Sequence, residues 1–80
     1  MDDRNIGALF PDKNEYRKRF AKKFTSIMVE EECTYRELSE LTGISWTTLS
    51  SYGSGRAIPS LYAIQIIAEA IGYSIDEFKV

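Results

Sequence analysis

The residues best able to do chemistry in this chain are basic and lie close together near its amino end. Between residues 13 and 23 there are six lysines and arginines against one acid, so this stretch has a local net charge of +5 in a chain of net charge −2. They are Lys13, Arg17, Lys18, Arg19, Lys22 and Lys23. Clustered basic side chains attract phosphate. The cluster therefore indicates contact with nucleic acid, and an ordinary solvated helix face is the alternative interpretation.

Side chains suited to catalysis or metal binding are scarce. The chain has no histidine, and Cys33 is its only cysteine. Neither an internal disulfide, nor a Cys/His zinc cluster, nor histidine-based catalysis is available from these residues. We therefore expect a protein that is not an enzyme, without a metal or a small-molecule cofactor. Cys33 itself is expected to be a small buried apolar residue, and redox sensing is the alternative.

The length and composition predict one small domain. The chain has 80 residues, 44% of them hydrophobic, which is enough for a single core. No apolar run approaches the roughly 18 residues that a membrane span needs. Residues 1–10 lack the basic start and the apolar stretch of a secretion signal. We therefore expect a soluble, intracellular protein that does not bind membranes.

The basic cluster requires a helix to position it. Asp12 is expected to cap a helix that runs to about Glu31. Apolar side chains recur along it at helical spacing, which predicts a stripe that faces the core. They are Tyr16, Phe20, Phe24, Ile27 and Met28. Residues 1–11 have no clear period and end at Pro11, so we assign 1–11 to an N-terminal arm and 12–80 to the domain.

Residues 34–52 predict two short helices joined by a tight turn. Thr34 and Glu37 form a T-x-x-E capping box, and Gly43 is expected in the left-handed conformation that ends a helix. Ser45 then caps the second helix. The expected apolar faces are Leu38 with Leu41 on the first helix, and Leu49 with Tyr52 on the second. This is a helix-turn-helix, whose second helix is free to enter a DNA major groove.

The remaining residues predict a loop and two further helices. Residues 53–59 are rich in glycine and end in a proline, so they form the loop. Ser60 caps the next helix and Gly72 ends it. Its apolar stripe is Leu61, Ile64, Ile67, Ala68 and Ile71. Ser74 and Glu77 repeat the capping box before a short last helix. The predicted fold class is therefore all-α, with five helices.

From Phe20 to Phe78 the sequence resembles the lambda-repressor-like, Xre/Cro family of helix-turn-helix DNA-binding domains. The motifs that carry the resemblance are T-x-x-E-L-S-E-L-T-G-I-S, T-L-S-S-Y, G-R-x-I-P-S and L-x-x-I-x-x-I-A-E-A-I-G-Y-S-I-D-E-F, in this order. The resemblance implies a compact five-helix lambda-repressor-like domain. It also implies a cytoplasmic transcriptional regulator, most often a repressor encoded by a bacterium, a phage or a mobile element. Such a regulator would bind double-stranded operator DNA as a homodimer, at an inverted repeat.

The resemblance further implies which residues meet DNA. The recognition helix would begin at Ser45, and the side chains that face the bases would be Trp46, Thr47, Ser50 and Ser51. The expected phosphate contacts are Arg17, Lys18, Lys22, Tyr35, Ser45, Ser54, Gly55 and Arg56. None of the four base-facing residues is arginine or glutamine, which are among the strongest bidentate readers of guanine and adenine. Base readout is therefore expected to be weak, or DNA shape to contribute more.

The sequence departs from the family at two positions together. The family commonly pairs an arginine on the first helix with a glutamate just after the recognition helix, and the aligned residues here are Met28 and Gly53. Because both partners are absent, no orphan charge is buried. Gly53 is expected to leave the loop more flexible.

Three alternatives remain open from the sequence. Trp46 could contact DNA, fold back over the basic helix, or form part of a dimer surface. Tyr62 and Tyr73, with Ile6, Leu9 and Phe10 of the arm, could cover a partner or pack within the same chain. The whole domain could also be a protein-interaction module, an antitoxin-like or antirepressor scaffold that uses the same fold, as its acidic net charge allows.

Overall fold

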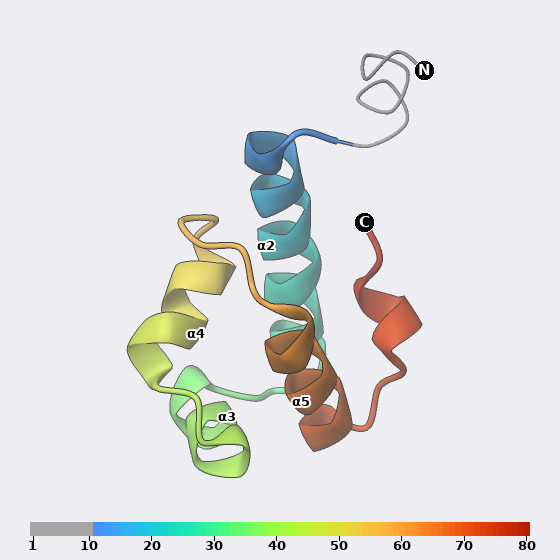
Figure 1. The fold of residues 1–80 in the computed structure, drawn as a ribbon. Coiled ribbons are helices and arrows are strands. Elements are labelled where there is room, and N and C mark those ends of the chain that lie inside the picture. Colours follow the sequence, from blue (N-terminus) through green and yellow to red (C-terminus); the bar gives the residue numbers. More distant parts are fainter. Residues whose placement is uncertain (1–10) are drawn as a thin grey trace.

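The computed structural model describes residues 11–80, and the predicted arm lies outside them except for Pro11. The described residues form four α-helices and one 3-10 helix, with no strand in this part of the chain (Figure 1). The all-α class is confirmed. The short fifth helix forms at the predicted place, but η1 (Ile75–Phe78) is a 3-10 helix of 4 residues and not an α-helix. Its N–H groups donate three residues back, Glu77 N to Ser74 O at 3.0 Å and Lys79 N to Asp76 O at 3.2 Å.

The predicted capping box at η1 is also absent. Ser74 Oγ accepts from Asp76 N at 3.2 Å, and not from Glu77 N. Since Lys79 is already extended, only four residues follow the cap, which is too short for a stable ladder of i→i+4 hydrogen bonds.

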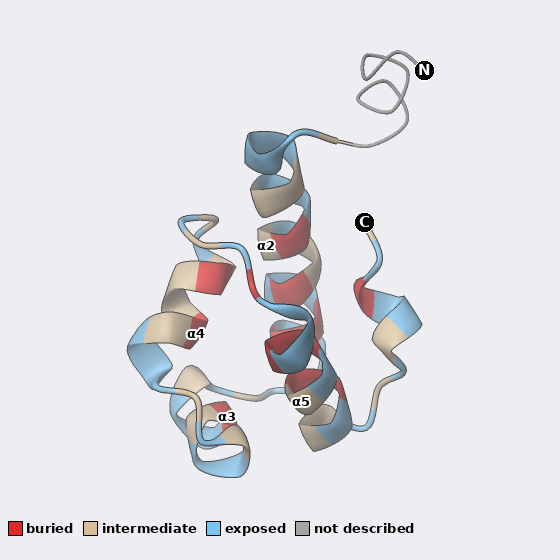
Figure 2. Ribbon diagram, in the orientation of Figure 1, coloured by how far each residue is buried: buried red, intermediate tan, exposed pale blue. Residues whose placement is uncertain are grey.

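The first helix, α2 (Lys13–Glu30), follows the predicted bounds closely. Asp12 Oδ1 accepts from Glu15 N at 2.8 Å, so this cap forms as expected. The predicted stripe faces the core, with Tyr16 half-buried at its start and the other four side chains buried (Figure 2). These four are Phe20, Phe24, Ile27 and Met28.

The two helices of the helix-turn-helix are α3 (Tyr35–Thr42) and α4 (Trp46–Gly53). Glu37 N donates to Thr34 Oγ1 at 3.1 Å and Thr34 N donates to Glu37 Oε1 at 2.9 Å, so the capping box is complete. The hydrogen bonds from Thr34 favour the carboxylate and lower the pKa of Glu37. Gly43 ends α3 at φ +80°, as predicted. The turn therefore follows from local sequence.

The apolar face expected for α3 is half wrong. Leu38 is 0% exposed, whereas Leu41 is 65% exposed. A step of three residues turns a helix by about 300°, so Leu41 lies about 60° away from Leu38 around the axis. This rotation takes Leu41 out of the core and toward the exposed Tyr62 of α5, beside which it lines a surface hollow. The second predicted face is confirmed, because Leu49 and Tyr52 of α4 are both buried.

The last α-helix is α5 (Leu61–Ile71), capped by Ser60 and ended by Gly72 at φ +78°. Its buried side chains are Ala63, Ile64, Ile67 and Ala68. Two residues expected in the stripe are not in this buried set: Leu61, the first residue of the helix, is 64% exposed, and Ile71, the last, is half-buried. Beyond α5, the Tyr73 hydroxyl donates to Glu31 Oε2 at 2.8 Å, so the chain after α5 is tied to the end of α2. This hydrogen bond raises the pKa of Tyr73.

The helices are arranged around α2, with α4 on one side of it and η1 on the other (Figure 1). Phe20 of α2 connects both sides, because its ring centroid lies 6.4 Å from that of Tyr52 in α4 and 5.9 Å from that of Phe78 in η1. One apolar stripe on α2 therefore positions α4 and the carboxyl end together.

Replacement of Leu49 by alanine should destabilise the domain by about 2 to 5 kcal/mol, because its side chain is 0% exposed and its loss leaves a cavity. Leu41→Ala is the matched control, since it removes the same atoms from a site that is 65% exposed. It should change the free energy of unfolding by no more than about 0.5 kcal/mol. Thermal and urea unfolding of both variants measures the difference, and equal losses would show that the core is misplaced.

Candidate nucleic-acid interface

The start of α4 presents two side chains to solvent. Ser45 Oγ accepts from Thr48 N at 3.2 Å and donates to Thr48 Oγ1 at 2.9 Å, so the Ser45 hydroxyl is already used in capping. Trp46 and Thr47 follow it, and Trp46 is 58% exposed. A hydroxyl with a methyl group and a large aromatic ring therefore stand side by side at the end of a helix, where they can reach a groove.

The next turn of α4 is less open than the sequence implied. Ser50 and Ser51 are both half-buried, and Ser51 Oγ donates to the Thr47 carbonyl at 3.1 Å. Only Trp46 and Thr47 of the four expected base-facing residues are exposed. The two serines can still offer hydroxyl oxygens as acceptors, but they are short and partly covered.

The loop after α4 returns to α2. Ser54 Oγ donates to the Ser51 carbonyl at 3.2 Å, and Gly55 adopts φ +80°. A Cβ placed on Gly55 would lie 3.7 Å from the carbonyl oxygen of Arg17 and 3.7 Å from Ala21 Cβ, so the loop packs on the first half of α2. Arg56 is exposed just beyond this contact. The structure thus brings together Arg17 and the loop residues expected to meet phosphate.

Tyr35, the first residue of α3, reaches the carboxyl end of α4. Its ring stacks on that of Phe24 with centroids 6.1 Å apart, and its hydroxyl lies over Gly53. Thr25 of α2, outside the predicted site, donates from Oγ1 to the Gly53 carbonyl at 3.3 Å. Gly53 is the last residue of α4, so the prediction that the loop begins there is wrong. No motif in the sequence singles out Thr25, because this hydrogen bond joins residues 28 positions apart.

These helices match a known family. The family model for helix-turn-helix domains matches residues 26–78, which is more than half of the chain. The chain belongs to the Xre, lambda-repressor-like helix-turn-helix family. This is a family of DNA-binding regulatory domains rather than of enzymes. No significant match is found among curated proteins or solved structures.

In this helix-turn-helix domain the basic cluster does not lie on one face. Arg17 is half-buried beside the loop, and its guanidinium donates to Asn14 Oδ1. Arg19 forms an ion pair with Glu15 at 3.0 Å. Lys22 lines a shallow groove with Arg19, Lys23, Ser26 and Val80, on a part of α2 away from the loop. Successive helical residues are turned by about 100°, which separates Lys22 from Arg17 by about 140°. Lys18 lies between them and is exposed.

The distribution of charge along α2 is not explained by helix stability. Lys13 occupies the first position of α2, and Glu30 and Glu31 occupy its last position and its C-cap. A helix dipole favours the opposite order, with acids at the amino end and bases at the carboxyl end. Arg36, a basic residue outside the predicted site, is also exposed in the first turn of α3. The first turns of α2 and α3 also contain the acids Glu15 and Glu37, so it is the acidic carboxyl end of α2 that departs from the favoured order.

Other features of the domain lie apart from α4. Cys33 is half-buried and not buried as expected, and its Sγ donates to the Thr34 carbonyl at 3.6 Å. Burial, with the charges of Glu37 and Glu31, raises the pKa of the Cys33 thiol, which keeps it protonated and less reactive. Among residues 11–80 no group of three or more His, Cys, Asp or Glu residues is placed to hold a metal ion. Within this described part of the chain, no helix combines the length and the apolar composition that crossing a membrane requires.

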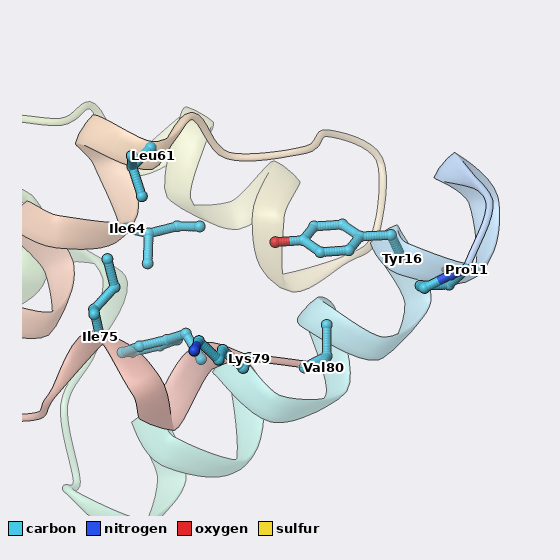
Figure 3. A pocket seen from close by; sticks show the side chains of 8 residues that line it. Pro11, Tyr16, Leu61, Ile64, Ile75, Lys79 and Val80 are labelled. Atoms are coloured by element: carbon cyan, nitrogen blue, oxygen red, sulfur yellow. The ribbon is translucent and has the colours of Figure 1, made fainter. Parts of the chain in front are cut away.

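A mainly apolar hollow lies between the start of α2, the start of α5 and η1 (Figure 3). It has a volume of about 500 Å³, and its walls include Tyr16, Ile64, Ile75 and Val80. Tyr16 and Lys79 contribute its polar side-chain groups, and Lys79 Nζ lies 3.3 Å from Asp76 Oδ1. This hollow offers apolar contact and is separate from the surface that carries Trp46 and Arg56.

Arg56→Ala should make the negative slope of log K against log salt concentration shallower by about 0.9 for duplex DNA, because one phosphate contact and its released counterion are lost. The control is Lys79→Ala, since Lys79 is an equally charged, exposed residue on the η1 side of the molecule. Fluorescence anisotropy over a range of salt concentrations measures both slopes. A slope that stays the same in Arg56→Ala would mean that the loop arginine is only a solvated side chain.

Proposed function

We propose that this protein is a sequence-specific transcriptional regulator, and that it is a repressor of the phage or mobile-element type. In this proposal α4 enters the DNA major groove, and Trp46 and Thr47 contact base edges. The observation that supports it most is the exposure of these two side chains at the start of α4, while Leu49 and Tyr52 anchor its opposite face in the core. An outer face with no packing role is available for recognition.

The phosphate contacts are proposed to flank α4 on both sides. The N–H groups of Ser54, Gly55 and Arg56 already donate to backbone carbonyls of α4, so this loop would contact phosphate through the exposed Arg56 side chain, close to Arg17 of α2. Such contacts position a protein on DNA without reading sequence. Lys18 and Lys22 lie about 100° and 140° from Arg17 around α2, so both would contribute mainly to the long-range field. The Tyr35 hydroxyl and the N–H groups at the start of α4 complete the proposed set.

A homodimer is proposed to bind an inverted repeat. Exposed large apolar side chains cluster where the loop enters α5, with Ile58 39%, Leu61 64% and Tyr62 71% exposed. Their proximity in sequence to the recognition helix would let a two-fold partner place a second α4 on the same side of the DNA. The paired helices would then read half-sites about 34 Å apart, one turn of the duplex.

Exposed apolar surface also supports a second candidate function. Leu41 and Tyr62 line one hollow between α3 and α5, although both side chains are more than half exposed. A different protein could cover this hollow, as an antitoxin-like or antirepressor scaffold would require. The two candidates differ in a direct experiment. Selection from random duplexes, followed by sequencing, should return an enriched inverted repeat for a regulator and no motif for an interaction module.

Thr47→Ala should leave the melting temperature nearly unchanged and weaken the selected site by about 1 to 3 kcal/mol, because Thr47 is exposed and touches only DNA in this proposal. Trp46→Ala should behave in the same way, with a smaller loss for random DNA. Anisotropy with the selected and with scrambled duplexes separates the two effects. If Trp46→Ala instead lowers stability first, Trp46 is a packing residue and not a reader.

Tyr62→Glu should abolish the dimer, because it places a charge within the proposed apolar contact. Val29→Glu is the control, since Val29 is an apolar side chain on α2 that is equally exposed, at 72%. Sedimentation equilibrium with and without the selected duplex gives the stoichiometry. Two chains per duplex in Tyr62→Glu would place the dimer contact elsewhere.

A further inference from the structure

The backbone conformation at position 53 does not require a glycine. Three other glycines, Gly43, Gly55 and Gly72, have positive φ angles, but Gly53 is the last residue of α4 and does not. Glycine is a poor helix former because it loses more backbone freedom than alanine does. The local conformation would therefore accept alanine, and would be more stable with it. The need for a glycine must come from what surrounds this position.

The surroundings contain the side chain of Tyr35. A Cβ placed on Gly53 would overlap Tyr35 Oη and would lie 2.9 Å from Cζ, closer than carbon atoms approach one another in folded proteins. The phenol ring fills the space that a side chain at position 53 would occupy. The sequence has a large aromatic residue at one position and no side chain at the other, so their sizes match.

Tyr35 cannot move aside without loss. Its ring stacks on Phe24 with an interplanar angle of 27°, and Phe24 is 0% exposed in the core. Gly53 is held from a second side, because Thr25 Oγ1 donates to its carbonyl. The last turn of α4 therefore lies between α2 and α3 with a fixed separation. Any atom added to Gly53 must displace either the Tyr35 ring or the end of α4.

We propose that Tyr35 and Gly53 form a size-matched pair that sets the position of α4, and that Tyr35 is thereby a positioning residue for DNA reading. The DNA-reading part of this inference rests on the proposed function. The loop that carries Arg56 starts directly after Gly53, and its contact with Arg17 and Ala21 fixes where it returns to α2. A shift at Gly53 consequently changes the direction of α4 and the position of the loop together.

The packing of Tyr35 against Gly53 is tested by whether Gly53→Ala raises or lowers the melting temperature. In wild-type background Gly53→Ala should lower the melting temperature by at least about 4 °C, a shift expected for a modest destabilisation of a domain of this size. Helix propensity alone would raise it. In a Tyr35→Ala background the same substitution should leave the melting temperature unchanged or raise it. A Tyr35→Phe background, which keeps the ring and removes Oη, should give partial relief and covers the case in which Tyr35→Ala does not fold.

Gly72→Ala is the matched control for this cycle. Gly72 has φ +78° and nothing within 4 Å of a built Cβ, so its replacement is strained for a backbone reason that is unrelated to Tyr35. It should lower the melting temperature equally in every background. If Gly53→Ala raises the melting temperature of the wild-type chain, or changes it equally in all backgrounds, Tyr35 and Gly53 are not a size-matched pair.

The positioning role is tested on DNA well below the melting temperature of Gly53→Ala. This variant should lose about tenfold in affinity for the selected duplex and clearly less for a scrambled one, because a displaced α4 loses base contacts before it loses phosphate attraction. An unchanged ratio of the two affinities would overturn the positioning role and leave the proposed function intact. If the wild-type protein selects no motif, the proposed function and the positioning role both fail. The melting temperatures of the single and double variants would still show whether Tyr35 and Gly53 are matched in size.

Discussion

The burial of two phenylalanines on α2 is the constraint on which the rest of the structure depends. Phe20 meets Tyr52 of α4 and Phe78 of η1, and Phe24 carries the ring of Tyr35 from α3. Aromatic pairs contribute about 0.5 to 1.5 kcal/mol each beyond the area that they bury. Because three partner rings come from three different elements, one stripe on one helix places all of them. α4 is therefore held mainly from α2, and its outer face is left free.

The residues of α4 that stabilise the fold are different from those that are free to contact a partner. Its inner side chains, Leu49 and Tyr52, are buried, whereas Trp46 and Thr47 at its start are exposed. The first turns of α2 and α3 contain the acids Glu15 and Glu37, but the first turn of α4 contains none. The positive end of its helix dipole is thus not neutralised by its own sequence, which suits a helix that approaches phosphate. Substitutions on this outer face can alter binding while the core stays intact.

What could be predicted from the sequence was decided by short-range chemistry. The capping box of Thr34 and Glu37 and the left-handed Gly43 involve residues a few positions apart, so they placed α3 and the turn correctly. The exposure of Leu41 was not predicted, because it depends on which neighbours α3 packs against. The position of Gly53 was missed for the same reason, since its environment is formed by Tyr35 and Thr25 from other helices. Within the candidate site, the exposure of Trp46 and Thr47 was expected, whereas the partial burial of Ser50 and Ser51 was not.

The net negative charge of the chain does not oppose DNA binding, and the length of α2 explains why. Its basic side chains lie between Lys13 and Lys23, while Glu30 and Glu31 lie at its other end, where the Tyr73 hydroxyl donates to both carboxylates at 3.3 and 2.8 Å. At about 1.5 Å per residue, Arg17 and Glu31 are separated by roughly 20 Å along the helix axis. The Debye length at physiological ionic strength is only about 8 Å, so the acids cannot neutralise the attraction that the basic end exerts on phosphate. The local charge next to α4, and not the sum over the chain, therefore decides which partner this surface attracts.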